Sequence, residues 1–358
     1  MNKQEKFKAV ASLGKKLDKQ FDTTTFQRQG NQVNKPIPCI PTNLPSLDRS
    51  VIGCGGFPRG RIVEVYGPES AGKTALCLHV IGQCQQAGGV CAFVDAEHSL
   101  SPTFADTLGV DMNELIISQP DYGEQALEIV EGLVDSKGVD LIVIDSVTAL
   151  VPKAELEGDM GDSHMGLHAR LMSQACRKLC AKAAVAGVCI VFINQIREKV
   201  GLVFGSPEVT TGGRALKFYA SLRLEVRRVA GSKGGVLKDG DTIYGHKANI
   251  KAVKNKVAMP FKESIVELHY ATGFQANDDL FEHALKIGVL TGTAKFVIKG
   301  TENKLTREAI LIEPANVECL RAAVDKYYAD LVAAAIANLE ESDETEEDED
   351  EDSTDAKR

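Results

Sequence analysis

The sequence predicts an α/β protein whose central sheet is mostly parallel and twisted. Short apolar strands alternate with helical stretches between residues 60 and 228, and the strands are continuous Val, Ile and Cys runs without polar alternation. Such runs indicate strands that helices cover on both faces of the sheet. The predicted strands are residues 62–66, 91–94, 141–144, 188–193 and 221–226.

A Gly-rich loop follows the first predicted strand. Residues 67–74 have the sequence GPESAGKT, which matches the motif G-x-x-x-x-G-K-[ST] between a strand and a helical pattern. Gly67 and Gly72 let successive backbone N–H groups point at one concavity, and the helix that follows adds its positive dipole end. Lys73 can then reach the β- and γ-phosphates of ATP, and the Thr74 hydroxyl can hold Mg²⁺. The alternative, a turn with a surface lysine, does not account for the flanking strand and helix.

The composition is that of a globular protein with a sizeable core, since 44% of residues are hydrophobic and 25% are charged. The net charge of -9 is unevenly placed, because residues 340–355 carry 12 acidic side chains and no basic one. The rest of the chain is therefore near neutral. Its first 35 residues hold 8 Lys or Arg against 3 acids, so local basic patches can attract a polyanion.

The cysteines favour a reduced, cytoplasmic protein. There are nine of them, an odd number without a C-x-x-C pair, and most lie in apolar contexts. No segment approaches the ~18 uninterrupted apolar residues of a membrane span, and the basic N-terminus lacks the apolar stretch of a secretory signal. We therefore expect no membrane association.

An amphipathic helix is predicted near the N-terminus, over residues 3–21. A lone helix cannot bury its apolar stripe, so this helix must pack on its own chain or on a neighbouring subunit, and the periodicity leaves both open. Prolines after residue 35 predict a linker over residues 27–43, which suits a docking arm of residues 1–35. The stripe consists of Phe7, Val10, Leu13, Leu17 and Phe21.

Three further regions follow this arm. Residues 36–272 form the predicted core, in which residues 242–253 and 264–270 add antiparallel strands at the sheet edge. Beyond Gly273, short helical patterns around a small hairpin predict a small α+β C-terminal domain over residues 273–339. Residues 340–358 form an acidic tail that is too charged to fold.

Polar residues at the ends of neighbouring strands predict a hydrolytic site. Asp145 follows the strand at residues 141–144, where P-loop proteins place the acid that holds Mg²⁺. Glu97 lies two residues past Asp95, at the end of the adjacent strand, and is placed to orient and deprotonate an attacking water. Gln195 ends the fourth strand and can contact the γ-phosphate. Each acid alone is equally explained as a helix cap or turn carboxylate, but ligands bind where parallel strands end together.

Two Gly-rich segments lack helical or strand periodicity, at residues 155–166 and 196–213. The second is a long unstructured loop for a compact domain, which is typical of a functional segment. Cations and apolar tips on flexible backbone favour a groove for nucleic acid of any sequence, and a substrate lid is the alternative. The cations are Arg197, Lys199 and Arg214, and the apolar tips are Met165, Val200 and Phe204.

Several long motifs resemble those of the bacterial RecA-type recombinases, in the same order. They are GPESAGKT, VDAEHSLSP, IDSVTALVPKAELEGDMGDSHMGLHARLMSQA, FINQIREKVGLVFGSPEVTTGGRALKFYASLR and AVKNKVAMPFK. The resemblance covers residues 5–270 well and the C-terminal domain only loosely. It implies a P-loop NTPase with a RecA-like core, and a DNA-dependent ATPase that forms filaments on single-stranded DNA and exchanges strands with homologous double-stranded DNA. It also implies roles in recombination, repair and the DNA-damage response, with a LexA-like repressor, single-strand-binding proteins and mediator proteins as further partners.

The resemblance also implies the residues of the ATP site. Glu97 would be the general base, Asp145 and Thr74 would hold Mg²⁺, and Gln195 would link the γ-phosphate to the second DNA loop. Lys254 and Lys256 would reach the nucleotide of the neighbouring subunit, so the site would be complete only in a filament. The remaining nucleotide contacts would be Gly67, Pro68, Glu69, Ser70, Ala71, Gly72, Lys73, Thr74, Ala75, Phe104 and Tyr270, the two aromatic residues lying beside adenine.

By the same resemblance, loops 157–165 and 197–211 would hold DNA. Lys217 and Phe218 would lie at the interface between subunits. The DNA contacts would be Met165, Arg170, Arg197, Lys199, Val200, Thr210, Thr211, Gly212, Gly213 and Arg214. The chain departs from the family pattern at Phe104, usually Tyr, at Arg214, usually Asn, and in the segment 231–246, which is longer than expected.

Two other functions compete with the recombinase. A hexameric P-loop helicase would share the core and the site between subunits, but the docking arm and the two specific loops argue against it. A filament that acts as a scaffold or co-protease for a repressor would not need strand exchange.

Overall fold

The computed structural model describes residues 1–21, 36–159, 166–198, 208–230 and 234–355, with the backbone alone for residues 198 and 336–355. The chain forms two compact units, Met1–Ile37 and Pro38–Arg358. Each unit is considered by itself below.

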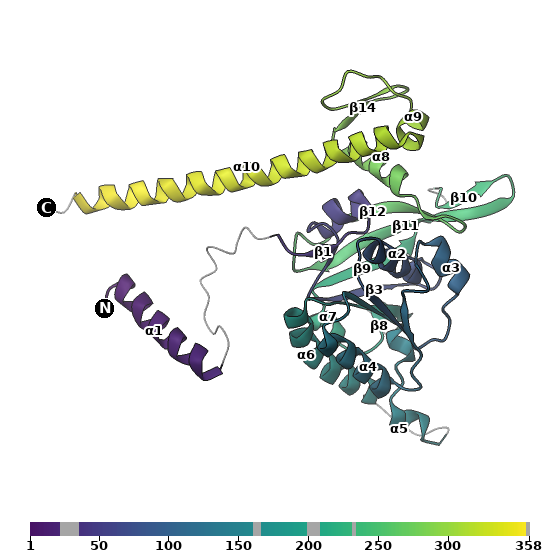
Figure 1. The fold of residues 1–358 in the computed structure, drawn as a ribbon, viewed down its shortest axis with the longest axis horizontal. Helices are drawn as coiled ribbons and strands as arrows, with labels where there is room; N and C mark the ends of the chain where they lie inside the picture. Colours follow the sequence, from purple (N-terminus) through teal and green to yellow (C-terminus); the bar gives the residue numbers. More distant parts are fainter. Residues whose placement is uncertain (22–35, 160–165, 199–207, 231–233, 356–358) are drawn as a thin grey trace. The chain divides into compact units, whose positions relative to one another are not determined.

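Helix α1 (Lys3–Phe21) makes up the first unit and confirms the predicted amphipathic helix (Figure 1). Its first turn is closed by a capping box, in which the Glu5 backbone N–H donates to Asn2 Oδ1 at 2.9 Å and the Asn2 N–H donates to Glu5 Oε2 at 3.0 Å. The stripe residues Phe7, Leu13 and Phe21 remain exposed.

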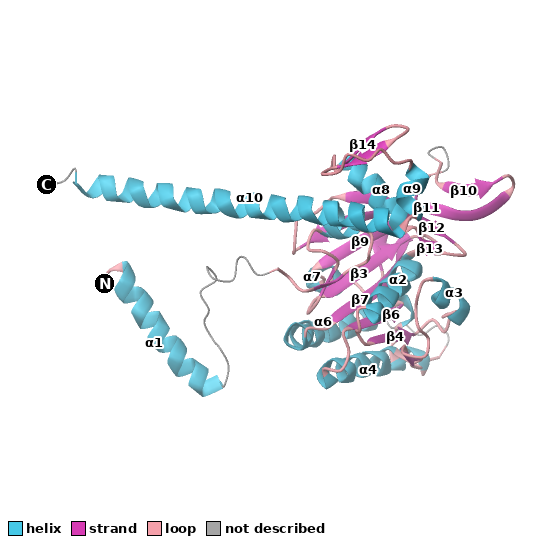
Figure 2. Cartoon of the chain, turned by 45° about the horizontal axis from the view of Figure 1, so that its top comes forward, coloured by secondary structure: helices cyan, strands magenta, loops and turns pink. Residues whose placement is uncertain are grey.

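The second unit is built on an 11-stranded sheet with helices on both faces (Figure 2). Its strands are β3 (Ile62–Gly67), β4 (Cys91–Asp95), β5 (Ile116–Ser118), β6 (Leu141–Asp145), β7 (Cys189–Glu198), β8 (Glu208–Thr210), β9 (Leu222–Arg228), β10 (Val236–Asp239), β11 (Thr242–Asn255), β12 (Glu263–His269) and β13 (Gly273–Phe274). Two small sheets pair β1 (Cys39–Ile40) with β2 (Phe57–Pro58) and β14 (Leu290–Gly292) with β15 (Phe296–Ile298). The helices are η2 (Ser46–Ile52), α2 (Lys73–Gln86), α3 (Pro102–Thr107), α4 (Gly123–Ser136), η3 (Val147–Ala149), α5 (Lys153–Leu156), α6 (Leu167–Ala186), α7 (Ala215–Tyr219), α8 (Ala276–Lys286), α9 (Arg307–Ile312) and α10 (Pro314–Asp355).

The centre of the sheet is parallel, in the order β9-β3-β7-β6-β4-β5, and all five predicted core strands are present. The register sets Gly67 opposite Gln195 and Asp95 opposite Asp145. The ends of β3, β7, β6 and β4 therefore meet at one edge of the sheet, which confirms the convergence expected from the sequence.

Separate hydrophobic layers cover the two faces of this sheet. On one face, α2, α3 and η2 pack against alternate strand residues such as Val63 and Val191. On the other face, α4, α6 and α7 pack against the intervening residues, such as Ile62 and Ile190. Because side chains alternate along a strand, both layers need apolar residues, and this explains the continuous Val and Ile runs.

The antiparallel strands predicted beyond residue 240 are also confirmed. β11 pairs with β9 on one side and with β12 on the other, and β13 closes the edge. The segment that is longer than expected forms a hairpin, in which β10 pairs with the first residues of β11. Residues 231–233 lie outside the described residues.

A third hydrophobic cluster lies beyond residue 276, where α8, α9, the start of α10 and the β14–β15 hairpin pack around Phe281, Phe296 and Leu320. Helix η2 joins this cluster to the sheet. The backbone N–H of Ser46 donates to Asp279 Oδ2 at 2.9 Å, and Arg49 pairs with Asp325 at 2.9 Å.

Two buried carboxyl groups lie at this junction and make its stability depend on pH. Burial raises the pKa of Asp48 to about 7 and that of Asp279 to about 6, although hydrogen bonds from Thr42 and Ser46 act in the opposite direction. The folded protein therefore keeps protons that the unfolded chain, with an ordinary pKa of 3.8, releases. We expect the free energy of unfolding to fall as the pH rises from about 4 to about 7.

The variant Asp279→Asn tests this expectation, because an uncharged amide still accepts from the Ser46 N–H. Chemical denaturation across the same pH range should show a shallower fall for this variant than for the unchanged protein. Equal slopes would show that Asp279 does not titrate in that range.

The structure differs from the sequence-based expectations in two connecting segments. The predicted linker 27–43 is wrong for its last residues, since Cys39 and Ile40 form β1 and Ile40 is buried. The predicted unstructured loop 196–213 is wrong at both ends, because residues 196–198 continue β7 and pair with β8. Strands this short form only where a partner offers its backbone groups, and that partner is not visible in local sequence.

The acidic tail also differs from its prediction, because residues 340–355 continue α10 as helical backbone. Glutamate is a good helix former, and the Ala-rich stretch at residues 333–337 leads directly into the tail, so local propensity opposes the repulsion between like charges.

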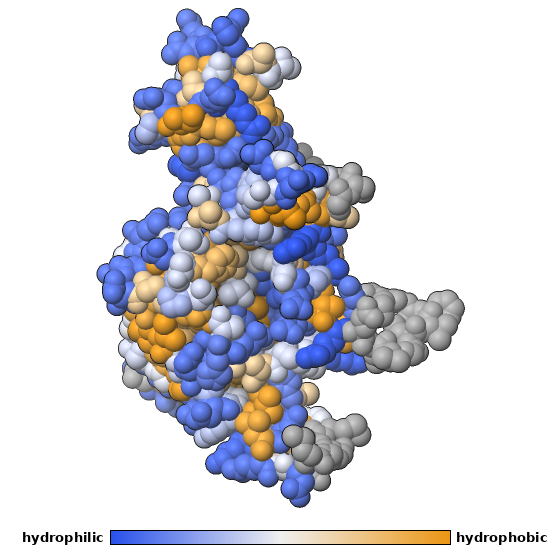
Figure 3. Space-filling model, turned by 90° about the vertical axis from the view of Figure 1, so that its right-hand side faces the viewer, coloured by the Kyte–Doolittle hydropathy of each residue, from blue (hydrophilic) through white to orange (hydrophobic). Residues whose placement is uncertain are grey.

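The face drawn in Figure 3 is largely hydrophilic, with hydrophobic surface divided into separate patches. Large apolar side chains that stay exposed include Phe218 and Phe261, at 69% each. Among the described residues, no helix is both long enough and apolar enough to span a membrane.

Candidate functional site

The phosphate-binding loop connects β3 to α2 at the converging edge of the sheet. Gly67 leaves no room for a side chain, since a Cβ there would lie 2.0 Å from the Val226 carbonyl oxygen. Gly72 precedes α2 with φ +99°, a conformation that residues with a Cβ rarely adopt. These two positions explain why the motif requires glycine at its ends.

Lys73 and Thr74 begin α2 and face the neighbouring strand ends. Lys73 is 8% exposed and its Nζ donates to the Pro68 carbonyl oxygen at 2.6 Å, so the lysine arches over its own loop. Burial lowers the pKa of Lys73, whereas Asp145 and Glu97 act to raise it. A loop that curls under an ammonium group suits a polyphosphate.

Thr74 and Asp145 form a pair that fits a magnesium ion. The Thr74 hydroxyl donates to Asp145 Oδ2 at 2.7 Å. Burial raises the pKa of Asp145 to about 6, with Glu97 and Asp95 acting in the same direction. The three acids Asp145, Glu97 and Asp95 outnumber the nearby Lys73 cation, and a hard divalent cation with oxygen ligands would supply further positive charge.

Glu97 lies beside this pair, at the turn after β4. The backbone N–H groups of Ala96 and Glu97 both donate to the Asp145 carbonyl oxygen, at 2.8 and 3.1 Å. Glu97 Oε1 accepts from Gln195 Nε2 at 2.9 Å and from the Ser146 hydroxyl. The structure thus brings the predicted base and the predicted sensor of the γ-phosphate into direct contact.

A cavity of about 230 Å³ opens next to the loop. It is lined by loop residues 70–75, by the aromatic residues Phe104 and Tyr270, and by Arg228, His246 and Leu268. Arg228 Nε donates to the Ser70 carbonyl oxygen at 2.7 Å. If the phosphates of a bound nucleotide lie at Lys73, its base lies in the same cavity as the aromatic rings of Phe104 and Tyr270, which can stack on it.

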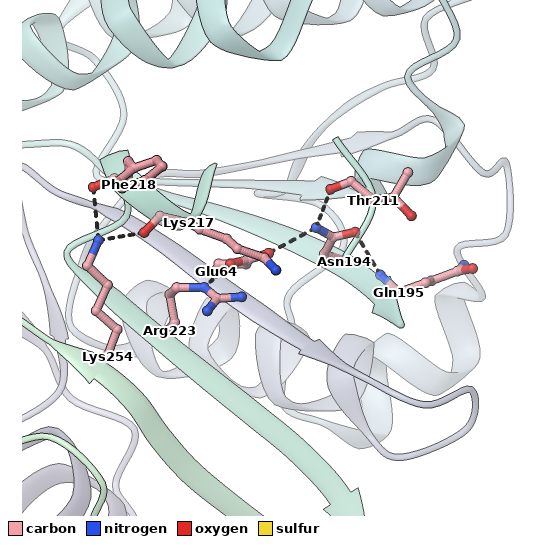
Figure 4. Close-up of polar contacts among 8 residues, drawn as sticks. All are labelled: Glu64, Asn194, Gln195, Thr211, Lys217, Phe218, Arg223 and Lys254. Carbon is pink, nitrogen blue, oxygen red and sulfur yellow. Dashed lines mark hydrogen bonds and ion pairs between the residues drawn. The ribbon is translucent and has the colours of Figure 1, made fainter. Parts of the chain in front are cut away.

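A buried polar network runs from Gln195 toward the outer strands, as Figure 4 shows. Asn194 Oδ1 accepts from the Gln195 N–H at 2.9 Å, and Asn194 Nδ2 donates to Glu64 Oε1 at 2.9 Å and to the Thr211 carbonyl oxygen at 3.0 Å. Glu64 is fully buried and pairs with Arg223 from β9. The network therefore joins the strand of the phosphate loop to the segment that follows β8.

Arg223→Ala should destabilise the fold strongly, because it leaves the Glu64 carboxylate buried without its cation. We expect a loss of about 3–5 kcal/mol in the free energy of unfolding, measured by chemical denaturation. The matched double variant Glu64→Gln with Arg223→Met removes both charges and should recover most of this loss. A double variant as unstable as Arg223→Ala would contradict the assignment to an unpaired charge.

Lys254 lies on β11 and Lys256 directly follows this strand, away from the phosphate loop of their own chain. Lys254 Nζ donates to the carbonyl oxygens of Lys217 and Phe218 at 2.6 and 2.9 Å, and Lys256 Nζ lies 3.3 Å from the Phe218 oxygen. Burial, with Lys256 and Arg223 nearby, lowers the pKa of Lys254 to about 8. The four predicted interface residues therefore form one cluster beside the exposed ring of Phe218.

The residues predicted to bind DNA lie around β7, β8 and α6. Arg197 and Arg214 are exposed, at the β7–β8 ladder and just before α7, and Arg170 is exposed on the first turn of α6. Thr210 ends β8, and Thr211, Gly212 and Gly213 follow it toward α7. The Thr148 hydroxyl donates to Thr211 Oγ1 at 3.4 Å. Met165, Lys199, Val200 and Phe204 lie outside the described residues.

Sequence reasoning assigned no role to Glu64, Arg223, Ser146, Arg228 or His246. A charged residue within the apolar run IVEVY was a visible signal for Glu64. Buried charges are rare without a partner, so this position could have indicated a buried ion pair, although none was predicted there. The other four depend on contacts between distant segments and gave no such signal.

A phosphate loop at the carboxyl edge of a parallel sheet, with two acids on the adjacent strand ends, defines a P-loop nucleotide-binding protein. The family model for the RecA N-terminal domain matches residues 8–275. The chain is 54% identical over 289 residues to the protein RecA 1 of Myxococcus xanthus, covering 80% of this chain and 82% of that one. It is 52% identical to the RecA proteins of Acinetobacter baylyi over 285 residues, covering 80% of each chain, and of Cutibacterium acnes over 284 residues, covering 79% of this chain and 80% of that one.

The chain belongs to the RecA family and is a recombinase of DNA recombination and repair. Membership implies DNA-dependent ATPase activity, DNA binding, filament formation and a general dependence on nucleotide and Mg²⁺.

Proposed function

We propose that the protein hydrolyses ATP to ADP and phosphate within a filament on single-stranded DNA, and that this hydrolysis drives strand exchange with homologous double-stranded DNA. Bound ATP supplies the γ-phosphate whose loss loosens the filament, and Mg²⁺ neutralises charge on it. Lys73 and residues 67–75 would hold the phosphates, while Thr74 and Asp145 would hold the metal. Glu97 would take the proton of the attacking water.

The contact between Gln195 and Glu97 carries this proposal. Gln195 lies within β7, two residues before Arg197, and β7 pairs with β8 at that point. Gln195, which contacts the Glu97 carboxylate, thus lies on the same strand as Arg197, a predicted DNA contact. Loss of the γ-phosphate can then move Gln195 and, through β7, the part of β7 that pairs with β8 and carries Arg197.

The proposal also assigns a role to each region of the chain and names the partners of the filament. Residues 1–35 would dock on the next subunit, residues 36–272 would form the ATPase core, and residues 273–339 would be a separate C-terminal domain. The filament would act in the cytoplasm and would also contact a LexA-like repressor and single-strand-binding or mediator proteins.

ATP hydrolysis with and without single-stranded DNA, combined with negative-stain imaging, tests the proposal. We expect stimulation by DNA and filaments in the presence of ATP and Mg²⁺. A monomeric preparation that hydrolysed ATP at full rate without DNA would contradict it, and directional unwinding of duplex DNA would favour a helicase.

Removal of residues 340–358 should strengthen DNA binding, because the 12 acidic side chains at residues 340–355 no longer compete with phosphates. Titration of labelled single-stranded DNA at several salt concentrations measures this effect. A control variant that keeps the length and changes the acids to Gln or Asn separates charge from helix length. If the truncated protein kept the affinity and salt dependence of the full chain, the tail would not have this role.

A further inference from the structure

His246 is a buried residue at the nucleotide cavity that the proposed function does not use. It is 3% exposed and lies on β11, paired with Val236 of β10 and Leu268 of β12. Its Nε2 lies 3.4 Å from the Ala71 carbonyl oxygen, and its Nδ1 lies 3.2 Å from the Tyr270 hydroxyl. One imidazole ring thus joins the phosphate loop to an aromatic residue of the cavity.

The two contacts and the burial of the ring together favour one form of it. The Ala71 carbonyl oxygen can only accept, so Nε2 carries the proton and donates to it. Nδ1 is then an acceptor, and the Tyr270 hydroxyl donates to it. Burial lowers the pKa of His246, with Arg228 acting in the same direction and the hydrogen bond to Ala71 acting against it, so the neutral ring is favoured.

The position of Tyr270 gives this bond a consequence for ligand binding. Tyr270 is 41% exposed and lines the same cavity as Phe104, Lys73 and Thr74. An aromatic ring can stack on a nucleobase, and a ring whose orientation is already fixed loses less conformational entropy when it does so. The His246 and Tyr270 rings lie 5.7 Å apart at 49°, so the hydroxyl bond and the ring contact together hold the tyrosine.

We propose that His246 positions Tyr270 against the base of the bound nucleotide and so determines the base-dependent part of nucleotide affinity. The inference rests on the nucleotide site proposed above and adds a positioning residue to it. It also gives a role to the segment 231–246. The β10–β11 hairpin formed by this segment pairs along β11 as far as His246 and contributes to its burial.

Three variants separate the contacts of His246. His246→Ala removes both hydrogen bonds, Tyr270→Phe removes only the bond to the tyrosine, and His246→Gln can restore both through its amide N–H and carbonyl oxygen. The probes are ATP and inorganic tripolyphosphate, each with Mg²⁺, in competition with a fluorescent ATP analogue. Tripolyphosphate has no base, so it reports on the phosphate loop alone.

We expect His246→Ala and Tyr270→Phe each to weaken ATP binding by about five- to tenfold, with no change for tripolyphosphate. The double variant should be no weaker than His246→Ala, because both changes remove the same bond. His246→Gln should recover most of the affinity for ATP. Unchanged tripolyphosphate binding also shows that the phosphate loop of each variant is folded.

Other results would overturn the proposal. Equal loss for ATP and tripolyphosphate would mean that His246 supports only the phosphate loop, and additive losses in the double variant would mean that the two residues act separately. Unchanged ATP binding in His246→Ala would mean that His246 does not position Tyr270 for nucleotide binding. An unaltered protein that bound neither probe would instead contradict the nucleotide site itself.

Discussion

Glu97→Gln is expected to lower DNA-stimulated ATP hydrolysis by about 10²- to 10⁴-fold while ATP and DNA binding persist, which is the usual contribution of a general base. The amide has the shape of the carboxylate but cannot take a proton from water. It also keeps an oxygen that can accept from Gln195 or from the Ser146 hydroxyl, so the local geometry is preserved. The filament should then remain locked in its ATP-bound form.

The measurement compares turnover with the binding of a fluorescent nucleotide and of labelled single-stranded DNA. Glu128→Gln, at an exposed position on α4, is a matched control that should behave as the unaltered protein does. Normal turnover in Glu97→Gln would mean that another group activates the water. Loss of ATP binding in the same variant would assign Glu97 to binding instead.

Lys254→Ala is expected to lower DNA-stimulated ATPase activity by at least about tenfold, because the lysine would stabilise charge on the nucleotide of the neighbouring subunit. In the isolated chain its ammonium group contacts the Lys217 and Phe218 carbonyl oxygens, on the cluster with the exposed Phe218 ring. Its pKa of about 8 indicates an ammonium group that gains from a nearby negative charge.

Mixing experiments distinguish a contact between subunits from one within the chain. A filament of Lys254→Ala and Lys73→Ala subunits should recover about a quarter of normal activity, since a quarter of randomly formed interfaces join both intact parts. Lys247→Ala, on the same strand and paired with Glu267, is the control that should lose little. Absence of recovery on mixing would place the role of Lys254 within its own subunit.

The parts of the site that sequence predicted are those encoded locally. The run before Gly67, the motif that follows it and the polar ends of the next three strands each lie within a few residues, and parallel pairing then brings them together. The bond between Gln195 and Glu97 follows from that pairing, although no single segment contains it.

What sequence missed depends on pairs of distant residues. Glu64 and Arg223 are 159 positions apart, and His246 meets Ala71 across 175 positions. The three-residue strand β8 has too little local pattern to be recognised without its partner β7. The backbone beyond residue 340 is helical where the sequence predicted an unfolded tail, and the reason here is local. Helix propensity favours the helix, whereas repulsion between the acidic side chains opposes it.

Helix α2 is buried on nearly every side, including its residues Leu76, Val80 and Ile81. A helix enclosed in this way exchanges its amide hydrogens only when the whole core opens. A spectroscopic label in the middle of α2, away from Lys73 and Thr74, would therefore report on opening of the core and not on steps of the catalytic cycle. A reporter of the catalytic cycle belongs on the outer elements instead, such as the surface around Arg197 or Phe218, where the chain is open to solvent and to its neighbours.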